Sequence, residues 1–126
     1  MTTIKSYTDI PQSKKLAKIL PIESADNVIV SFGSREGRET VVMPKETLDV
    51  IRTPFDDIRE TTMCWSLAAL LDLCPTINGK QPILTRGKLT SLWYCYYEDE
   101  IDTQTYDNPI DACYELILKL NELNLL

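Results

Sequence analysis

The chain has 126 residues, 13 Lys/Arg, 19 Asp/Glu and no histidine, which gives a formal net charge of −6. This balance argues against nucleic-acid binding and against attachment to an anionic membrane, because both partners carry negative charge. Without histidine, Ser-His-Asp and Cys-His catalytic arrangements and most zinc and iron sites are excluded. The length predicts one globular domain over residues 1–126, with a core that needs no disulfides.

The four cysteines lie mostly within apolar segments and form no C-x-x-C pair: Cys64, Cys74, Cys95 and Cys113. We expect them to be reduced and mostly buried in a cytoplasmic protein, since disulfides are rare in that compartment. Their spacing predicts no metal site, and no phosphate-loop or dinucleotide motif indicates a cofactor. The N-terminus shows no signal-peptide pattern.

The first predicted helix covers Ser13–Leu20. Leu16, Ile19 and Leu20 share one face of this helix, whereas its three lysines face water. Pro21 ends the helix because proline cannot continue it. The pattern is typical of a short amphipathic helix with one buried side.

Two short β-branched segments, Asn27–Phe32 and Glu39–Met43, predict strands joined by the polar link Gly33–Arg38. Two glycines in this link favour a β-hairpin. Beyond the hairpin, we expect one or two helical turns over Lys45–Ile51. Arg52–Thr61 is expected to be a polar connection and the most mobile segment of the chain.

The segment Met63–Cys74 predicts the central helix of the domain. Only Ser66 and Asp72 are polar within it, so no face of the helix suits solvent. Thr62 is the expected N-cap and Pro75 the expected end. Because the segment is too short to span a bilayer, it is predicted to be a buried helix that other elements cover.

The next segment contains two predicted strands. After the reversal signal Asn78-Gly79, they cover Pro82–Thr85 and Leu89–Tyr97, and the acidic turn Glu98–Asp102 follows. Both faces of the second strand carry large side chains. It is therefore either a central strand covered on both sides or a strand that leaves one aromatic face to a partner.

The last predicted helix begins at Asn108 and runs to about Glu122. Asn108 is the expected N-cap, Pro109 occupies the first helical position, and Asp111 lies near the positive end of the helix dipole. Together these elements predict an α+β fold, in which a small, mainly antiparallel sheet of about four strands is packed by the buried central helix and the C-terminal helix.

Three stretches carry a resemblance to a known group of proteins: Tyr7–Asp26, Trp65–Leu71 and Asp107–Leu120. They resemble short uncharacterised proteins encoded by phages and mobile elements of gut Bacteroidetes, and they cover roughly a third of the chain. The resemblance implies a bacterial or phage-infected cytoplasm. It implies no activity and no catalytic residue.

Two basic turns form one candidate site, with Arg35 and Arg38 in the first hairpin and Arg86 and Lys88 in the second. If both hairpins belong to one sheet and their turns share an edge, four cations converge there. Such a cluster suits a phosphate or a nucleotide. Basic residues on solvated turns are the alternative interpretation.

The aromatic stretch Trp93, Tyr94, Tyr96 and Tyr97 forms a second candidate site, beside the acidic turn. Trp and Tyr are enriched at the centres of protein interfaces, so one face of this strand would suit a basic partner or a second copy of the chain. Packing of these aromatic side chains in the core is the alternative.

The sequence therefore favours a non-enzymatic interaction protein, such as a phage or mobile-element accessory protein that binds a host protein or self-associates. The alternative is a small anionic-ligand binding protein that uses the two basic turns. An enzyme built on Asp and Glu side chains that meet only in the fold is a third option. No catalytic residue is assigned, and we expect neither a nucleic-acid nor a membrane partner.

Overall fold

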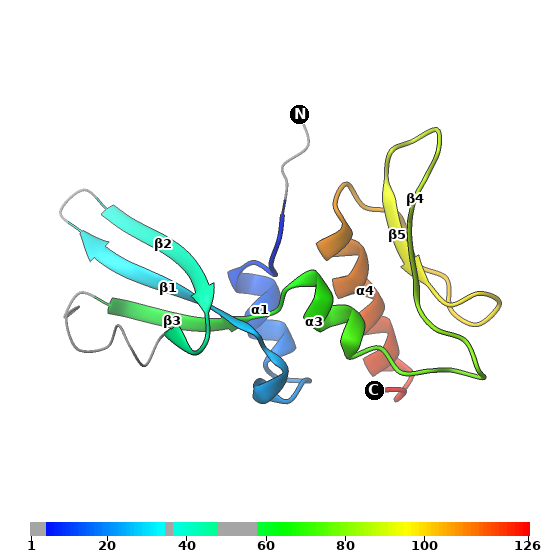
Figure 1. Ribbon diagram of the computed structural model, residues 1–126, viewed down its shortest axis with the longest axis horizontal. Coiled ribbons are helices and arrows are strands. Elements are labelled where there is room, and N and C mark those ends of the chain that lie inside the picture. The colour runs from blue at the N-terminus through cyan, green and yellow to red at the C-terminus, as the bar shows by residue number, and fades with distance from the viewer. Residues whose placement is uncertain (1–4, 35–36, 48–57) are drawn as a thin grey trace. The chain divides into compact units, whose positions relative to one another are not determined.

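The computed structural model describes residues 5–34, 37–47 and 58–126. The chain divides into two compact units, which we call the N-terminal unit (Asp9–Trp65) and the C-terminal unit (Met1–Thr8 with Ser66–Leu126). The predicted α+β class is confirmed, because the strands form two antiparallel sheets that combine with α-helices (Figure 1). Within the described ranges, no helix has the length and apolar character needed to cross a membrane. The single domain over residues 1–126 stays a prediction.

The N-terminal unit contains a three-stranded sheet with the order β2-β1-β3. Its strands are β1 (Asn27–Ser34), β2 (Gly37–Pro44) and β3 (Ile58–Cys64), and β1 pairs antiparallel with both neighbours. Consecutive residues of β1 from Asn27 to Ser31 are buried. Since successive side chains point to opposite faces, this central strand is covered on both sides.

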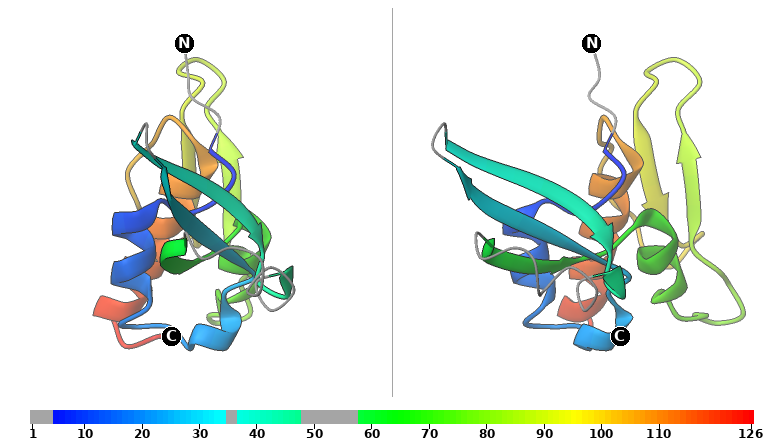
Figure 2. Two further views of the ribbon diagram at one scale, coloured as in Figure 1. Left: turned by 90° about the vertical axis from the view of Figure 1, so that its left-hand side faces the viewer. Right: turned by 60° about the vertical axis from the view of Figure 1, so that its left-hand side comes forward.

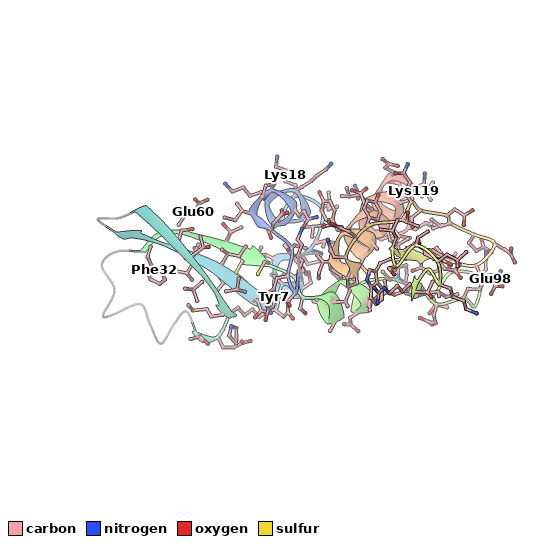
Figure 3. The ribbon with its side chains drawn as sticks, turned by 90° about the horizontal axis from the view of Figure 1, so that it is seen from above. Tyr7, Lys18, Phe32, Glu60, Glu98 and Lys119 are labelled. Atoms are coloured by element: carbon pink, nitrogen blue, oxygen red, sulfur yellow. The ribbon has the colours of Figure 1, made fainter. Side chains whose placement is uncertain are left out.

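Helix α1 (Ile10–Leu16) packs against β3 in the same unit. It begins with a capping box, in which the Gln12 backbone N–H donates to the Asp9 carboxylate at 2.8 Å and the Asp9 N–H donates to Gln12 Oε1 at 3.1 Å. The predicted start at Ser13 is therefore three residues too late, because the box lies upstream of it. The predicted faces are correct: Leu16 is buried, and the lysine side chains, including Lys18 in Figure 3, face outward.

A short 3₁₀ helix, η1 (Ile22–Ser24), follows α1 and leads to β1. The indole of Trp65 is fully buried, and its Nε1 donates to Ser24 Oγ at 2.9 Å. The largest side chain of this core therefore has its one polar atom satisfied, as a buried tryptophan requires.

The C-terminal unit is built around α4 (Pro109–Glu122), which packs against α3 (Leu67–Asp72) and against a two-stranded sheet. That sheet pairs β4 (Ile83–Arg86) antiparallel with β5 (Trp93–Tyr96). Seven residues of α4 are buried: Ile110, Ala112, Cys113, Tyr114, Leu116, Ile117 and Leu120.

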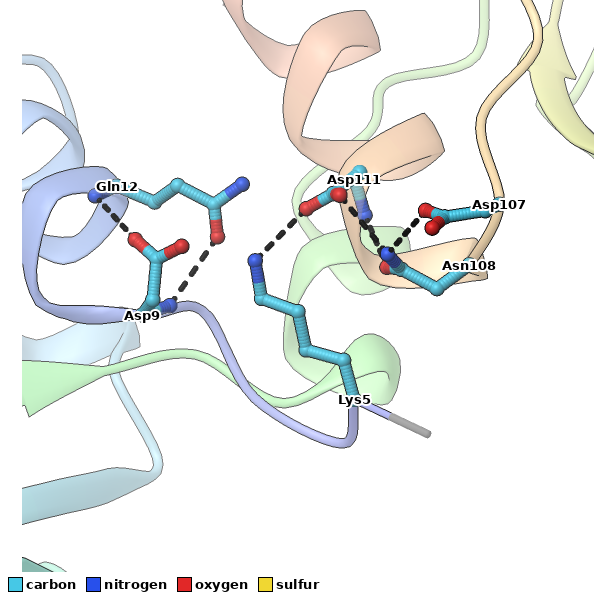
Figure 4. A network of polar contacts seen from close by, with 6 residues as sticks. All are labelled: Lys5, Asp9, Gln12, Asp107, Asn108 and Asp111. Atoms are coloured by element: carbon cyan, nitrogen blue, oxygen red, sulfur yellow. Dashed lines mark hydrogen bonds and ion pairs between the residues drawn. The ribbon is translucent and has the colours of Figure 1, made fainter. Parts of the chain in front are cut away.

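The N-terminus of α4 has the Asn108 cap that the sequence predicts. The side chain of Asn108 accepts from the Asp111 N–H at 2.8 Å, and its Nδ2 donates to Asp111 Oδ2 at 2.8 Å and to Asp107 Oδ1 at 3.0 Å. Lys5 donates to the other oxygen of Asp111 at 2.8 Å (Figure 4). The N-terminal segment is thus tied to the first turn of α4.

The predicted start of the central helix is wrong. Thr62, Met63 and Cys64 belong to β3, and the helix begins only after Ser66, whose Oγ accepts from the Ala69 N–H at 3.3 Å. Leu70 is its one buried residue, so α3 is a short, half-exposed helix rather than a fully covered one. The β-pairing of residues 58–64 with β1 outweighs the local helical preference of this segment.

Two other expectations change with this boundary. The predicted polar connection Arg52–Thr61 contains the first residues of β3, because Ile58–Thr61 pair with β1, whereas residues 52–57 lie outside the described part. The helical turns expected over Lys45–Ile51 are described only to residue 47. The sequence predicted a single sheet, but the strands form two separate sheets, one for each hairpin.

The turn at Asn78-Gly79 is confirmed. Both residues have positive φ angles, 50° and 78°, and Ile77 and Lys80 exchange backbone hydrogen bonds across them. Asn and Gly are the residues that adopt this left-handed backbone most readily, so the local sequence alone specifies the reversal.

Candidate functional site

The two faces of the β4–β5 sheet differ in what covers them. Cross-strand partners share a face, so Leu84 lies with Cys95 on one side, and Ile83 lies with Tyr96 on the other. Cys95 is fully buried and β5 packs against α4, which identifies the Cys95 side as the core side. The opposite side, which we call the outer face, remains half-exposed.

The outer face presents a pair of stacked tyrosines. Tyr94 and Tyr96 are two residues apart on β5, and their ring centroids lie 5.0 Å apart with an interplanar angle of 20°. Their cross-strand partners on the same face are Thr85 and Ile83. The four side chains form a continuous aromatic and aliphatic surface that is neither core nor fully solvated.

The acidic turn lies next to this pair. Partial burial raises the pKa of the Tyr96 phenol, and the charges of Tyr94, Glu98 and Asp102 raise it further. Glu98 and Asp102, at the two ends of the turn, are thus the carboxylates whose charge acts on Tyr96. Glu98 and Asp102 are exposed, and Glu98 is labelled in Figure 3.

Hydrogen bonds hold the acidic turn in a defined conformation. The Tyr97 N–H donates to Ile101 O at 3.0 Å, the Glu100 N–H donates to Tyr97 O at 3.1 Å, and Asp99 has a φ angle of 60°. Lys80 Nζ donates to the Glu98 carbonyl at 2.9 Å and lies 3.7 Å from the Asp99 carboxylate. The turn is thus fixed at both ends while its carboxylates stay in solvent.

A shallow, open hollow of about 420 Å³ begins at Asp102 and continues toward α4. Burial raises the pKa of the Tyr106 phenol, and the nearby carboxylates of Glu115 and Asp111 add to that effect. Lys119 lies one turn beyond Glu115 on the exposed side of α4 (Figure 3). The lining consists of six polar or amphipathic residues: Asp102, Thr103, Gln104, Tyr106, Glu115 and Lys119.

The four aromatic residues singled out from the sequence have three different environments. Tyr94 and Tyr96 form the outer face, whereas Trp93 is half-buried on the opposite side, 5.9 Å beneath the Arg86 guanidinium. Tyr97 is fully buried, and its hydroxyl donates to Pro75 O at 2.7 Å. Tyr97 is therefore a core residue of this unit and offers no surface to a partner.

Two of the four basic residues singled out from the sequence, Arg38 and Arg86, lie on different sheets. Arg86 and Lys88 belong to the β4–β5 hairpin, where Arg86 Nε donates to Ser91 O at 3.2 Å and Lys88 is exposed. Arg35 lies outside the described part of the chain, as does the side chain of Arg38, whose backbone belongs to β2. The shared sheet edge on which the anion-site prediction depended is not formed, because the hairpins belong to separate sheets.

The four cysteines are free thiols and all are buried, as expected. Cys74, Cys95 and Cys113 belong to the C-terminal unit, where Cys95 hydrogen-bonds Cys113 and the Cys74 Sγ donates to Leu70 O at 3.4 Å. The hydrogen bond to Cys95, together with burial, raises the pKa of Cys113. Within the described ranges, no three acidic, cysteine or histidine side chains are arranged to hold a metal ion.

Sequence reasoning did not identify the hollow. Glu115 and Lys119 are four residues apart on α4, a spacing typical of an exposed helical face, and that is the one signal that points to them. The other lining residues follow β5 in an irregular segment, whose path no sequence pattern specifies. No family model matches the chain, and searches of the curated proteins and of the solved structures give no match.

Proposed function

We propose that the chain is a non-enzymatic protein that binds a basic segment of a partner protein on the outer face of β4–β5. The observation that carries this proposal is the stacked Tyr94–Tyr96 pair beside the carboxylates of Glu98 and Asp102. Half-exposed tyrosines stacked on a strand face give a partner a rigid contact area at a low entropic cost.

The chemistry of this face favours a cation. An Arg or Lys side chain can lie over a tyrosine ring while its charge pairs with an adjacent carboxylate. Here the two aromatic rings lie on β5 and the two carboxylates lie in the turn that directly follows it, and both carboxylates act on Tyr96. The hollow beyond Asp102 offers Glu115 to a second basic group.

The overall charge supports the same partner class. Residues 1–8 and 66–126 carry nine Asp/Glu and five Lys/Arg, so the C-terminal unit is itself acidic. A field of this sign speeds the encounter with basic partners and disfavours acidic ones. The resemblance to phage and mobile-element proteins adds a setting, in which the partner is a bacterial host protein in the cytoplasm.

The experiment compares capture of proteins from bacterial extract by the immobilised wild-type chain and by a Tyr94→Ser, Tyr96→Ser variant. We expect the double variant to lose at least about tenfold in affinity for the captured partner, since central aromatic residues dominate interface energies. Leu89→Ser is the matched control, because Leu89 is fully exposed on the turn of the same hairpin and lies outside the outer face.

The partner's binding segment is then prepared as a synthetic peptide, in its native form and with its Arg and Lys residues replaced by Gln. The proposal requires the native peptide to bind more tightly than the neutral one, and this preference to weaken in Glu98→Gln, Asp102→Asn. Equal capture by the wild type and the double tyrosine variant, with unchanged circular dichroism, would refute it.

A further inference from the structure

Strand β2 forms one edge of the sheet in the N-terminal unit, with β1 between it and β3 (Figure 2). Val41 and Val42, at the centre of β2, are 46% and 38% exposed. Successive residues of a strand point to opposite faces, so both faces of β2 carry an exposed apolar side chain at this point. Within the described part of this unit, β1 is the one strand to which β2 is hydrogen-bonded.

The register identifies the backbone groups that point away from the sheet. The Lys45 N–H donates to Asp26 O at 3.3 Å, directly beyond the paired residues Asn27 and Pro44. In an antiparallel pair, hydrogen-bonded positions alternate along the strand. Odd-numbered residues of β2 therefore bond to β1, and the N–H and C=O groups of Thr40 and Val42 point outward.

The centre of β2 lacks the devices that usually protect an edge strand. Natural edges carry charges, proline or a bulge that prevent pairing with another chain. Here the register with β1 contains no bulge, and residues 40–43, Thr-Val-Val-Met, include neither a charge nor a proline. Charged residues and Pro44 occur only toward the ends of the strand.

We propose that β2 pairs antiparallel with β2 of a second copy of this chain, with Val41 on the two-fold axis. In this register, Thr40 lies opposite Val42 of the other copy, so the outward groups of both residues form hydrogen bonds in each direction. Val41 lies opposite Val41 of the other copy, so these two exposed side chains contact each other and lose exposed surface. The result is a continuous six-stranded sheet across the dimer.

Self-complementarity selects this occupant and this register. Centring the pair on Thr40 places Glu39 opposite Val41, and centring it on Val42 places Thr40 opposite Pro44, which has no N–H to donate. The Val41 register places Glu39 opposite Met43 and Arg38 opposite Pro44 away from its centre. It alone places Val41 against Val41 while using all the outward groups of Thr40 and Val42. An isologous contact of this kind closes at two copies and leaves no further β2 edge open.

The first test is disulfide cross-linking of Val41→Cys after mild oxidation with copper phenanthroline. Directly opposite residues at a non-hydrogen-bonded position have Cα atoms about 4.5 Å apart, within the range that a disulfide spans. Met43→Cys is the control, because residue 43 shares that face but would lie roughly 13 Å along the strand from its copy. The native cysteines are buried, so the wild-type chain gives the background.

The second test is sedimentation of Val42→Pro across the micromolar range. Proline removes only the outward N–H at this position, so the sheet within one chain keeps its hydrogen bonds. We expect the wild type to be a dimer, and Val42→Pro to raise the dissociation constant at least about tenfold with an unchanged circular dichroism spectrum.

A monomeric wild type, a Val42→Pro variant that dimerises like the wild type, or equal cross-linking at positions 41 and 43 would overturn the proposal. The inference does not rest on the proposed function, because β2 and the outer face of β4–β5 belong to different units. Tyr94→Ser, Tyr96→Ser is accordingly expected to remain a dimer. A wild-type dimer whose capture of a partner is unaffected by the tyrosine substitutions would refute the proposed function alone. A wild-type monomer that captures a partner through these tyrosines would refute the β2 pairing alone.

Discussion

Tyr96, the last residue of β5, and Tyr97, which follows it, differ in exposure and in hydrogen bonding. Tyr96 lies on the half-exposed outer face, stacked on Tyr94, whereas Tyr97 is fully buried and its hydroxyl donates to Pro75 O at 2.7 Å. The two-residue period of a strand causes this difference, because adjacent side chains leave the backbone in opposite directions. A single aromatic run therefore serves both the core and a surface.

This difference predicts unequal effects of two Tyr→Phe substitutions on stability. Tyr97→Phe removes the hydrogen bond to Pro75 O and leaves that partly buried carbonyl without the phenol, so we expect the free energy of unfolding to fall by about 1–2 kcal/mol. Tyr96→Phe should change it by less than about 0.5 kcal/mol, as for other surface substitutions. Urea unfolding measures both, and equal losses would contradict the buried position of Tyr97.

At the scale of the elements, α4 is specified by its own sequence. Asn108 accepts from the Asp111 N–H at 2.8 Å, and the same Asp111 carboxylate receives Nδ2 of Asn108 and Nζ of Lys5. Asn108→Ala is expected to destabilise the chain by about 1–2 kcal/mol, because one helix N–H loses its acceptor and two donor contacts disappear.

Asn108→Ser is the matched control, since serine is also a good N-cap and should restore most of that loss. Lys5→Met tests the ion pair alone and is expected to cost less than about 1 kcal/mol, because both side chains are partly exposed. Thermal unfolding of the three variants ranks these contributions. A serine variant as unstable as the alanine variant would show that capping is not the cause.

The elements that sequence reasoning predicted well are those with local signals. The cap and apolar stripe of α4, the positive-φ turn at Asn78-Gly79 and the β1–β2 hairpin are each specified within a few neighbouring residues. The start of α3 was misplaced because Thr62 and Ser66 are both good N-caps, and only pairing of residues 58–64 with β1 decides between them.

Predicting the candidate site requires knowing which side of β5 is buried, and this depends on residues far away in the sequence. Its residues could be found as an aromatic strand and an acidic turn, but which side of β5 is buried depends on α4, which begins thirteen residues beyond Tyr96. The division of two hairpins between two sheets is likewise a matter of long-range pairing. No local pattern in either hairpin contains that information.

At the scale of the whole molecule, the two proposed surfaces use different physical means. The outer face of β4–β5 offers side chains, so charge and aromatic chemistry select its partner. The β2 edge offers backbone groups, so register and shape select a second copy. A dimer through β2 would present two outer faces, and a partner with two basic segments would then bind with an avidity beyond either single contact.

Buried thiols in both units are expected to make the chain less stable as the pH becomes alkaline. Burial raises the pKa of Cys64 from 9.0 to about 12, with a further contribution from the Asp26 carboxylate. Burial likewise raises the pKa of Cys74 to about 12, and the neighbouring Cys95 adds to this effect. In the folded chain both thiols therefore stay protonated at a pH where the unfolded chain has already ionised them.

A folded-state pKa above the unfolded value gives stability that is fully present below pH 9 and is lost as pH rises toward 12. We expect the free energy of unfolding to fall between pH 8 and pH 10 by about 1 kcal/mol for each shifted thiol. Urea unfolding across this range measures the slope, and Cys64→Ala should make it shallower whatever its effect at pH 7. If the wild type and Cys64→Ala lose stability in parallel above pH 9, the Cys64 thiol is not the group that titrates, and its burial in the N-terminal core would have to be reconsidered.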